Sequence, residues 1–145
     1  MHEMVHLIEP THNERFTSLL NQFYSAMQTE RAITLAIILR SSMNLIGVVN
    51  LRLPENETPH LGYWLGAAYW GKGYCTEAVL EMLRYGFSRL GLQQINARCY
   101  DNNAASEKVM RRCGMRKEPE SPVTEEINGR RVRLVNYSIT RNELM

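Results

Sequence analysis

Apolar residues recur at two spacings in the first half of the chain, and each spacing predicts a different element. Residues 13–29 carry apolar side chains at intervals of three and four, which is typical of an amphipathic helix. Residues 33–39 and 45–53 are apolar, β-branched runs separated by the polar residues 41–44, and they predict paired strands. Residues 61–65 predict a third strand. The expected order of this half is a helix followed by three strands.

The second half returns to helical spacing over residues 75–90. Gly91 is placed to end this helix, because glycine enters the left-handed region without steric cost. A short strand is expected at residues 95–100. Asn103 is a natural N-cap for a third helix, which we expect to end at Gly114.

Two closing strands are predicted at residues 115–118 and 131–139. They are joined through residues 127–130, where Asn128-Gly129 is a strong hairpin signal. The whole order is α-β-β-β-α-β-α-β-β, so the central β-α-β unit should pair in parallel and the outer strands should form antiparallel hairpins. We therefore expect a single α/β domain over residues 1–145, with a mixed central sheet and flanking helices.

Composition narrows the class of protein. Hydrophobic residues make up 44% of the 145 positions and charged residues 22%, which is ordinary globular composition. The net charge of +2 is too weak to indicate a nucleic-acid surface, and the longest apolar run is far below the roughly 20 residues that a membrane span needs. No secretion signal is recognisable at the start, and the three cysteines, an odd number, indicate reduced thiols. We expect a cytoplasmic protein that binds neither nucleic acid nor membrane.

The segment with the clearest chemistry is the glycine-punctuated loop at residues 66–73, which runs from a strand into a helix. The first-turn amides of a helix have no intrahelical partners, and the macrodipole adds partial positive charge there. Gly71 and Gly73 remove Cβ atoms, so that backbone N–H groups can approach an anion closely, and Lys72 adds a positive charge. A phosphate or pyrophosphate is the expected ligand.

The loop fits neither of two common nucleotide motifs. A P-loop needs four residues between its glycines and then Lys-Ser/Thr. A dinucleotide fingerprint needs a third glycine where Thr76 stands, although Asp101 could imitate its ribose-binding acid. The glycines alone are also compatible with nothing more than a tight strand-to-helix turn.

Several further motifs share a spacing with this loop over about residues 33–143. Together they resemble the GNAT family of N-acetyltransferases, and most closely the branch that contains the ribosomal-protein alanine N-acetyltransferases. The segments that carry the resemblance are Ile46-Gly47, Gly62-Tyr63-Trp64-Leu65, Tyr69-Trp70-Gly71-Lys72-Gly73-Tyr74, Thr76-Glu77-Ala78, Asn103-Ala104-Ala105-Ser106, Gly114-Met115, Ile127-Asn128-Gly129-Arg130 and Tyr137-Ser138.

The resemblance implies the N-acyltransferase fold of that family and acetyl-coenzyme A as co-substrate, with no metal. By this resemblance, backbone amides of the loop hold the pyrophosphate, while the main chain of Leu65 and the side chain of Asn103 bind the pantetheine arm from opposite sides. The implied cofactor-binding residues are Leu65, Trp70, Gly71, Lys72, Gly73, Tyr74, Cys75, Thr76 and Asn103.

Some positions depart from the family's pattern. Trp70 replaces the usual Arg or Gln, and Cys75 replaces Gly or Ala, where a packed small side chain is expected rather than a reactive thiol.

Met110 stands where many relatives carry the tyrosine that protonates the departing thiolate. Ser106 is the substitute donor, with first-turn helix capping as its alternative role. His60 stands where the branch commonly has glutamate; it is a candidate base, since its reference pKa of about 6.5 suits the task, or else a strand-edge histidine without a role.

The expected reaction moves an acetyl group from acetyl-coenzyme A to a primary amine, by direct attack while both substrates are bound. The acceptor is a peptide N-terminus or a small-molecule amine, and the sequence does not choose between them. The alternative is a catalytically degenerate member of the fold that binds coenzyme A or a protein partner without turnover.

The start of the chain raises two further questions. The family normally has a strand and a helix before the helix expected here at residues 13–29, so this pair looks missing or reduced. An uncovered sheet edge would invite a partner strand, so we expect a homodimer or another protection of this edge. His2, Glu3 and His6 match the zinc motif H-E-x-x-H, which works only on a packed helix. With Pro10 close behind, chance composition explains the match and no metal is expected.

Overall fold

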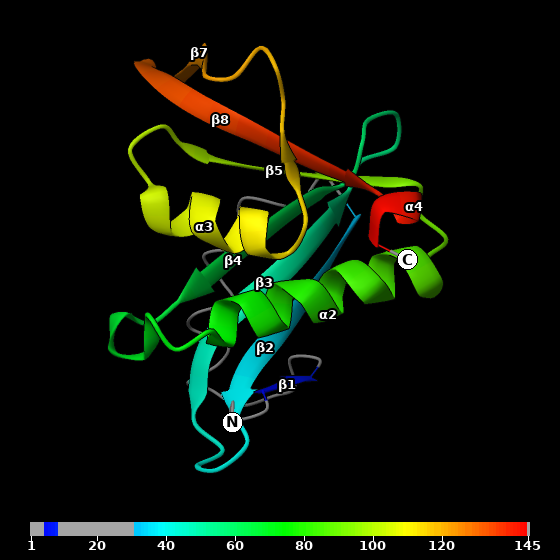
Figure 1. The fold of residues 1–145 in the computed structure, drawn as a ribbon, viewed down its shortest axis with the longest axis vertical. Coiled ribbons are helices and arrows are strands. Elements are labelled where there is room, and N and C mark those ends of the chain that lie inside the picture. The colour runs from blue at the N-terminus through cyan, green and yellow to red at the C-terminus, as the bar shows by residue number, and fades with distance from the viewer. Residues whose placement is uncertain (1–4, 9–30, 145) are drawn as a thin grey trace.

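The computed structural model describes residues 5–8 and 31–144 of the chain (Figure 1). In this part the strands form one sheet in the order β1-β2-β3-β4-β5-β8-β6, and β7 also pairs with β8. The strands are β1 (Val5–Ile8), β2 (Arg31–Leu39), β3 (Leu45–Leu53), β4 (His60–Leu65), β5 (Gln94–Tyr100), β6 (Arg116–Lys117), β7 (Val123–Ile127) and β8 (Arg130–Thr140). The helices are the 3-10 helix η1 (Ala67–Tyr69), α2 (Tyr74–Ser88), α3 (Ala104–Arg112) and α4 (Arg141–Leu144).

The sheet is mixed, as the sequence predicts. β1, β2, β3 and β4 pair antiparallel in succession, β4 and β5 pair in parallel, and β5 pairs antiparallel with β8. A parallel pair needs a crossover connection, and α2 supplies it. The α/β class with a parallel β-α-β centre is therefore confirmed.

The core lies between the sheet and the helices α2 and α3, which cover the same face (Figure 1). Val79, Met82 and Phe87 of α2 are fully buried against strand residues such as Val49 and Ile95, which are also fully buried. A smaller cluster of Ala36, Ile38 and Val48 is buried on the other face of β2 and β3. Burial on both faces explains why these two strands are almost continuously apolar rather than alternating.

The C-terminal strands differ from the prediction. β7 lies where no strand is expected, and the hairpin joins β7 to β8 through Asn128 (φ 52°) and Gly129 (φ 78°). Two consecutive positive φ values are the requirement of the tight turn that Asn-Gly favours. The strand expected at residues 115–118 is the shorter β6, which pairs with β8 independently. The short helix α4 is also absent from the prediction.

At the N-terminal end, the strand that the sequence suggested to be missing or reduced is present as the four-residue β1. It covers the outer edge of β2, so the edge strand of the described sheet on this side is β1. The helix expected at residues 13–29 lies outside the described residues. His6 belongs to an extended strand rather than a helix, and the other residues of the zinc motif lie outside the described residues. None of the helices within 31–144 is long and apolar enough to cross a membrane.

Candidate active site

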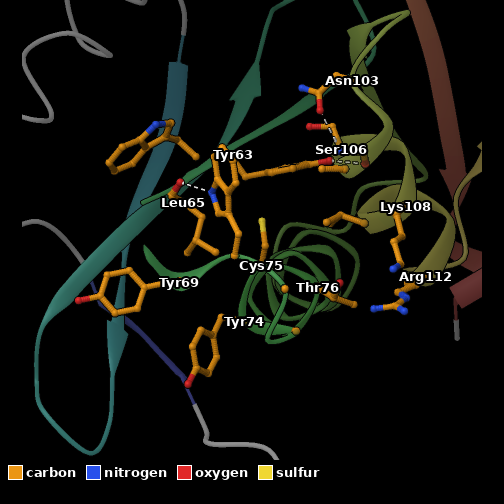
Figure 2. A pocket seen from close by; sticks show the side chains of 16 residues that line it. Tyr63, Leu65, Tyr69, Tyr74, Cys75, Thr76, Asn103, Ser106, Lys108 and Arg112 are labelled. Carbon is orange, nitrogen blue, oxygen red and sulfur yellow. Dashed lines mark hydrogen bonds between the residues drawn. The ribbon is translucent and has the colours of Figure 1, made fainter. Parts of the chain in front are cut away.

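A cavity opens where β4 and β5 separate. The two strands pair in parallel only at His60 with Asn96 and at Leu61 with Ala97, and they diverge beyond these pairs (Figure 1). The cavity has a volume of about 540 Å³ and lies between the end of β4, the start of α2 and the start of α3 (Figure 2). Its lining consists of Tyr63, Trp64, Leu65, Tyr69, Trp70, Gly71, Gly73, Tyr74, Cys75, Thr76, Asn103, Ala105, Ser106, Lys108, Val109 and Arg112.

The divergence leaves backbone groups of β4 facing the cavity. The Pro59 oxygen accepts from the amide of Asn96 on the β5 side (2.9 Å), whereas the Gly66 amide donates to Ile46 on the β3 side (2.8 Å). Successive peptide groups of a strand point to alternate sides, so odd-numbered residues face β5. Tyr63 and Leu65 lie beyond the last β4–β5 pair, and their main chains therefore present an open strand edge to a ligand.

The glycine loop forms the floor of one end of the cavity. Gly71 (φ 77°) and Gly73 (φ 82°) both adopt the left-handed region, which glycine enters without strain. Gly73 is the N-cap of α2, and no side chain caps this helix end. The first-turn residues Tyr74, Cys75 and Thr76 line the cavity, so the positive end of α2 is directed into it. Among the predicted loop residues, Lys72 is exposed and lies outside the lining.

Trp70 ties the loop to β4. Its indole Nε1 donates a hydrogen bond to the main-chain oxygen of Leu65, 2.7 Å away. Trp70 is 64% exposed, so most of the ring remains in contact with solvent at the mouth of the cavity. The contact joins two residues that the sequence proposed for the same ligand.

The opposite wall comes from the start of α3. The Asn103 side-chain oxygen accepts from the Ser106 amide (3.1 Å), so Asn103 is the N-cap that the sequence predicts. Its side-chain NH₂ group is not used in this cap and can donate to a ligand. Since Asn103 supplies the cap, helix capping does not account for the Ser106 side chain, which lines the cavity.

Tyr63 reaches from β4 to α3, as Figure 2 shows, and donates its hydroxyl hydrogen to the main-chain oxygen of Ser106 (3.0 Å). Burial raises the pKa of the Tyr63 phenol well above its ordinary value, so the hydroxyl remains a donor at neutral pH. Sequence reasoning placed Tyr63 only within the segment Gly62-Tyr63-Trp64-Leu65 and gave its hydroxyl no role. The available signal was its position two residues before Leu65, which places both side chains on one face of the strand.

The cysteines near the site are not nucleophiles. Burial raises the pKa of Cys75 to about 12, that of Cys99 to about 11 and that of Cys113 to about 12. A thiol needs a lowered pKa to attack a thioester readily at neutral pH. Cys113 also donates a weak hydrogen bond to the Thr76 oxygen (3.5 Å). These values favour the packing role for Cys75.

Two positions proposed or considered for catalysis lie outside the cavity lining. His60 is the first residue of β4, about 16 Å from Leu65 at about 3.3 Å per residue, and it points to the face opposite Tyr63. Met110 is 1% exposed and packs in the core. The structure thus brings the loop, Leu65, Asn103 and Ser106 together, and it leaves His60 on the other side of the sheet. Within residues 5–8 and 31–144, no three His, Cys, Asp or Glu side chains are grouped to hold a metal.

Comparisons with known proteins agree with this architecture. Residues 2–116 match the domain family described as Acetyltransferase (GNAT) domain. The uncharacterized N-acetyltransferase p20 of Bacillus licheniformis is 31% identical over 110 residues, which are 74% of this chain and 62% of that protein. The chain spans about three fifths of the length of the first curated relatives that it matches.

Two solved structures resemble the fold closely. The GNAT-family acetyltransferase from Bacillus anthracis superposes with a TM-score of 0.70 at 28% identity, covering 76% of this chain and 67% of the other. The microcin C7 self-immunity acetyltransferase MccE, solved in complex with acetyl-CoA and AMP, superposes with a TM-score of 0.68, also at 28% identity. That match covers 87% of this chain and 70% of MccE.

Proposed function

We propose, because this chain belongs to the GNAT family of acetyltransferases, that it binds acetyl-coenzyme A in the cavity between β4 and β5 and transfers the acetyl group to a primary amine. One observation carries the proposal: the uncapped N-terminus of α2 and the open edge of β4 face the same cavity. The first attracts a diphosphate and the second pairs with an extended amide-bearing arm. Acetyl-coenzyme A carries both groups in one molecule.

In this arrangement the diphosphate lies on the amides from Gly71 to Thr76. The pantetheine arm follows the open edge of β4, with the main chain of Leu65 on one side and the NH₂ group of Asn103 on the other. The acetyl carbonyl then lies near Tyr63, where a main-chain N–H polarises it. These placements are supported by the residues that line the cavity.

The chemistry needs no covalent enzyme intermediate. The amine nitrogen bonds to the acetyl carbon, the carbon–sulfur bond breaks, and the electron pair leaves with sulfur. Ser106 gives its proton to the thiolate, and a base receives the proton of the amine. We propose His60 for this base, acting through water because its side chain lies on the face of β4 opposite Tyr63. Holding both substrates in one site supplies much of the rate. The acceptor is a peptide N-terminus or a small-molecule amine.

A second function is favoured by the positions of Met110 and His60. The first is buried in the core, and the second lies outside the cavity lining. A chain of this kind can bind coenzyme A or a protein partner without turnover. In this alternative the residues proposed to bind coenzyme A keep that role, and only the transfer reaction is absent.

The deciding experiment combines calorimetry with a thiol-release assay. Acetyl-coenzyme A is titrated into the protein, and free thiol is then followed with a panel of peptides, polyamines, aminoglycosides and amino acids. Binding with release for at least one amine supports the transferase. Binding without release across the panel supports the binding protein, and no heat of binding contradicts both.

We also propose cytoplasmic activity and a homodimer. The three cysteines are free thiols, which is the usual state in a reducing compartment. An edge strand such as β1 can pair with the same strand of a second copy. Light scattering at micromolar concentration tests the dimer, and a monomer there contradicts it.

A further inference from the structure

α3 places two cationic side chains at the rim of the cavity. Lys108 and Arg112 are four residues apart, so they lie on one face of the helix, and both line the cavity. Figure 2 shows them extending from α3 on the side of the cavity where Thr76, in the first turn of α2, lies. Both are exposed to solvent.

The neighbouring Arg111 shows what a structural arginine of this helix does. Its Nε donates to the Tyr137 hydroxyl (3.0 Å), and its Nη2 contacts Glu107 (3.3 Å). Lys108 and Arg112 have no ion pair with any residue in the described ranges. Their position on the helix therefore leaves their charges directed to the cavity rather than to the fold.

The positive charges around the cavity favour an anion that carries more negative charge than a diphosphate alone. The positive end of α2 already faces the cavity, and the lining contains no Asp or Glu. Two like charges four residues apart also repel each other, so an anion between them removes a cost of the unliganded protein.

We propose that Lys108 and Arg112 bind the 3′-phosphate of coenzyme A, an inference that rests on the function proposed above. This phosphate monoester lies on the ribose, beyond the diphosphate, and carries nearly two charges at neutral pH. The planar guanidinium of Arg112 can donate two parallel hydrogen bonds to two oxygens of this phosphate, and the ammonium of Lys108 adds a second positive charge. The pair therefore selects coenzyme A over its 3′-dephospho form.

The test compares the affinities of acetyl-coenzyme A and acetyl-3′-dephospho-coenzyme A for the wild type and for the variant Lys108→Ala/Arg112→Ala. We expect the wild type to bind the phosphorylated form about 10 to 100 times more tightly, because charge-assisted hydrogen bonds are the strong ones. The double variant should lose this preference while its affinity for the dephospho form stays within about twofold. The preference of the wild type should also shrink as salt is raised.

Arg89→Ala is the matched control, because Arg89 is an exposed cation after α2 that lies outside the lining. It should leave both affinities unchanged. Lys108→Gln/Arg112→Gln removes the charges and keeps polar side chains, and thermal unfolding of each variant checks the fold. A wild type that binds both nucleotides equally overturns the inference but leaves the proposed function intact. A wild type that binds neither overturns the proposed function itself.

Discussion

The indole N–H of Trp70 donates a hydrogen bond to the main-chain oxygen of Leu65 across 2.7 Å. This bond ties the loop that follows β4 to the end of the strand, immediately before the glycines that precede α2. A carbonyl oxygen has two lone pairs, so Leu65 can still accept from a ligand. The resemblance noted in the sequence implies Arg or Gln at this position, and tryptophan, like both of these, offers an N–H donor.

Trp70→Phe removes this donor and keeps an aromatic ring. We expect the variant to lose about 1 kcal/mol of stability, the usual net value of one hydrogen bond, and to raise KM for acetyl-coenzyme A several-fold at nearly unchanged kcat. Trp70→Gln retains a donor and should recover part of both effects. Urea unfolding and steady-state kinetics measure them, and a Gln variant that behaves like Phe would show that the donor is irrelevant.

The glycine loop can be tested against a glycine of the same conformation elsewhere. Gly71 (φ 77°) and Gly91 (φ 65°) both have space for a Cβ atom, with no other atom within 4 Å of its ideal position. Replacement of either glycine by alanine should therefore lower the free energy of unfolding by about 1–2 kcal/mol, from backbone strain alone. Only Gly71→Ala should also weaken acetyl-coenzyme A binding in calorimetry. Equal weakening by Gly91→Ala would assign the loss to general instability.

Ser106→Ala tests the proposed proton donor. The fold should persist because the cap of α3 uses the Ser106 amide and the Asn103 side chain, not the serine hydroxyl. We expect kcat to fall by about 10²–10⁴, the typical contribution of a general acid, while the affinity for acetyl-coenzyme A changes little. Ser106→Thr keeps the hydroxyl and should retain more activity. Wild-type kcat in the alanine variant would remove Ser106 from the mechanism.

His60→Gln tests the proposed base from the other face of the sheet. If the imidazole accepts the proton of the amine, the wild-type rate falls at acidic pH, where the imidazole is protonated, and the glutamine variant loses that limb of the profile. The measurement is kcat/KM between pH 5 and 9 with a reactive amine. An unaltered pH profile would show that His60 is a strand residue without a catalytic role.

Cys75 should be inert at the pH of the reaction. Burial raises its pKa from 9.0 to about 12, so the folded state favours the neutral thiol and its labelling by iodoacetamide at pH 8 should be about a thousandfold slower than in the unfolded chain. The free energy of unfolding should fall as the pH rises above 9, because the Cys75 thiol ionises there in the unfolded chain and not in the folded chain. Mass spectrometry of native and denatured protein measures the labelling. Rapid native modification would contradict this environment for the thiol.

Local sequence was enough to predict the elements whose conformation depends on neighbouring residues. β3 begins and ends at the predicted residues Leu45 and Leu53, because its apolar run is bounded by polar and proline-containing segments. Asn103 caps α3, and Gly71 and Gly73 take the left-handed conformation, because these preferences act within a few residues. The prediction of an anion site at the N-terminus of α2 rests on the same local signals.

Local sequence patterns did not predict which residues far apart in the chain pair with one another. β7 contains Thr124, Glu125 and Glu126, which are polar and exposed, and it is a strand because β8 provides the partner. The contact of Tyr63 with Ser106 joins residues 43 positions apart. No periodicity within either segment carries that information.

The sequence by itself determined the mixed α/β class, the glycine loop and the residue types available to hold a nucleotide. Only the tertiary structure decided which of them share a cavity, because that depends on where β4 and β5 stop pairing. The divergence beyond Leu61 opens the cavity that Ser106 and Arg112 of α3 line, while the alternation of side chains along β4 places His60 on the other face. Hydrogen bonds between strands set this point, and they are formed by backbone groups that every residue carries.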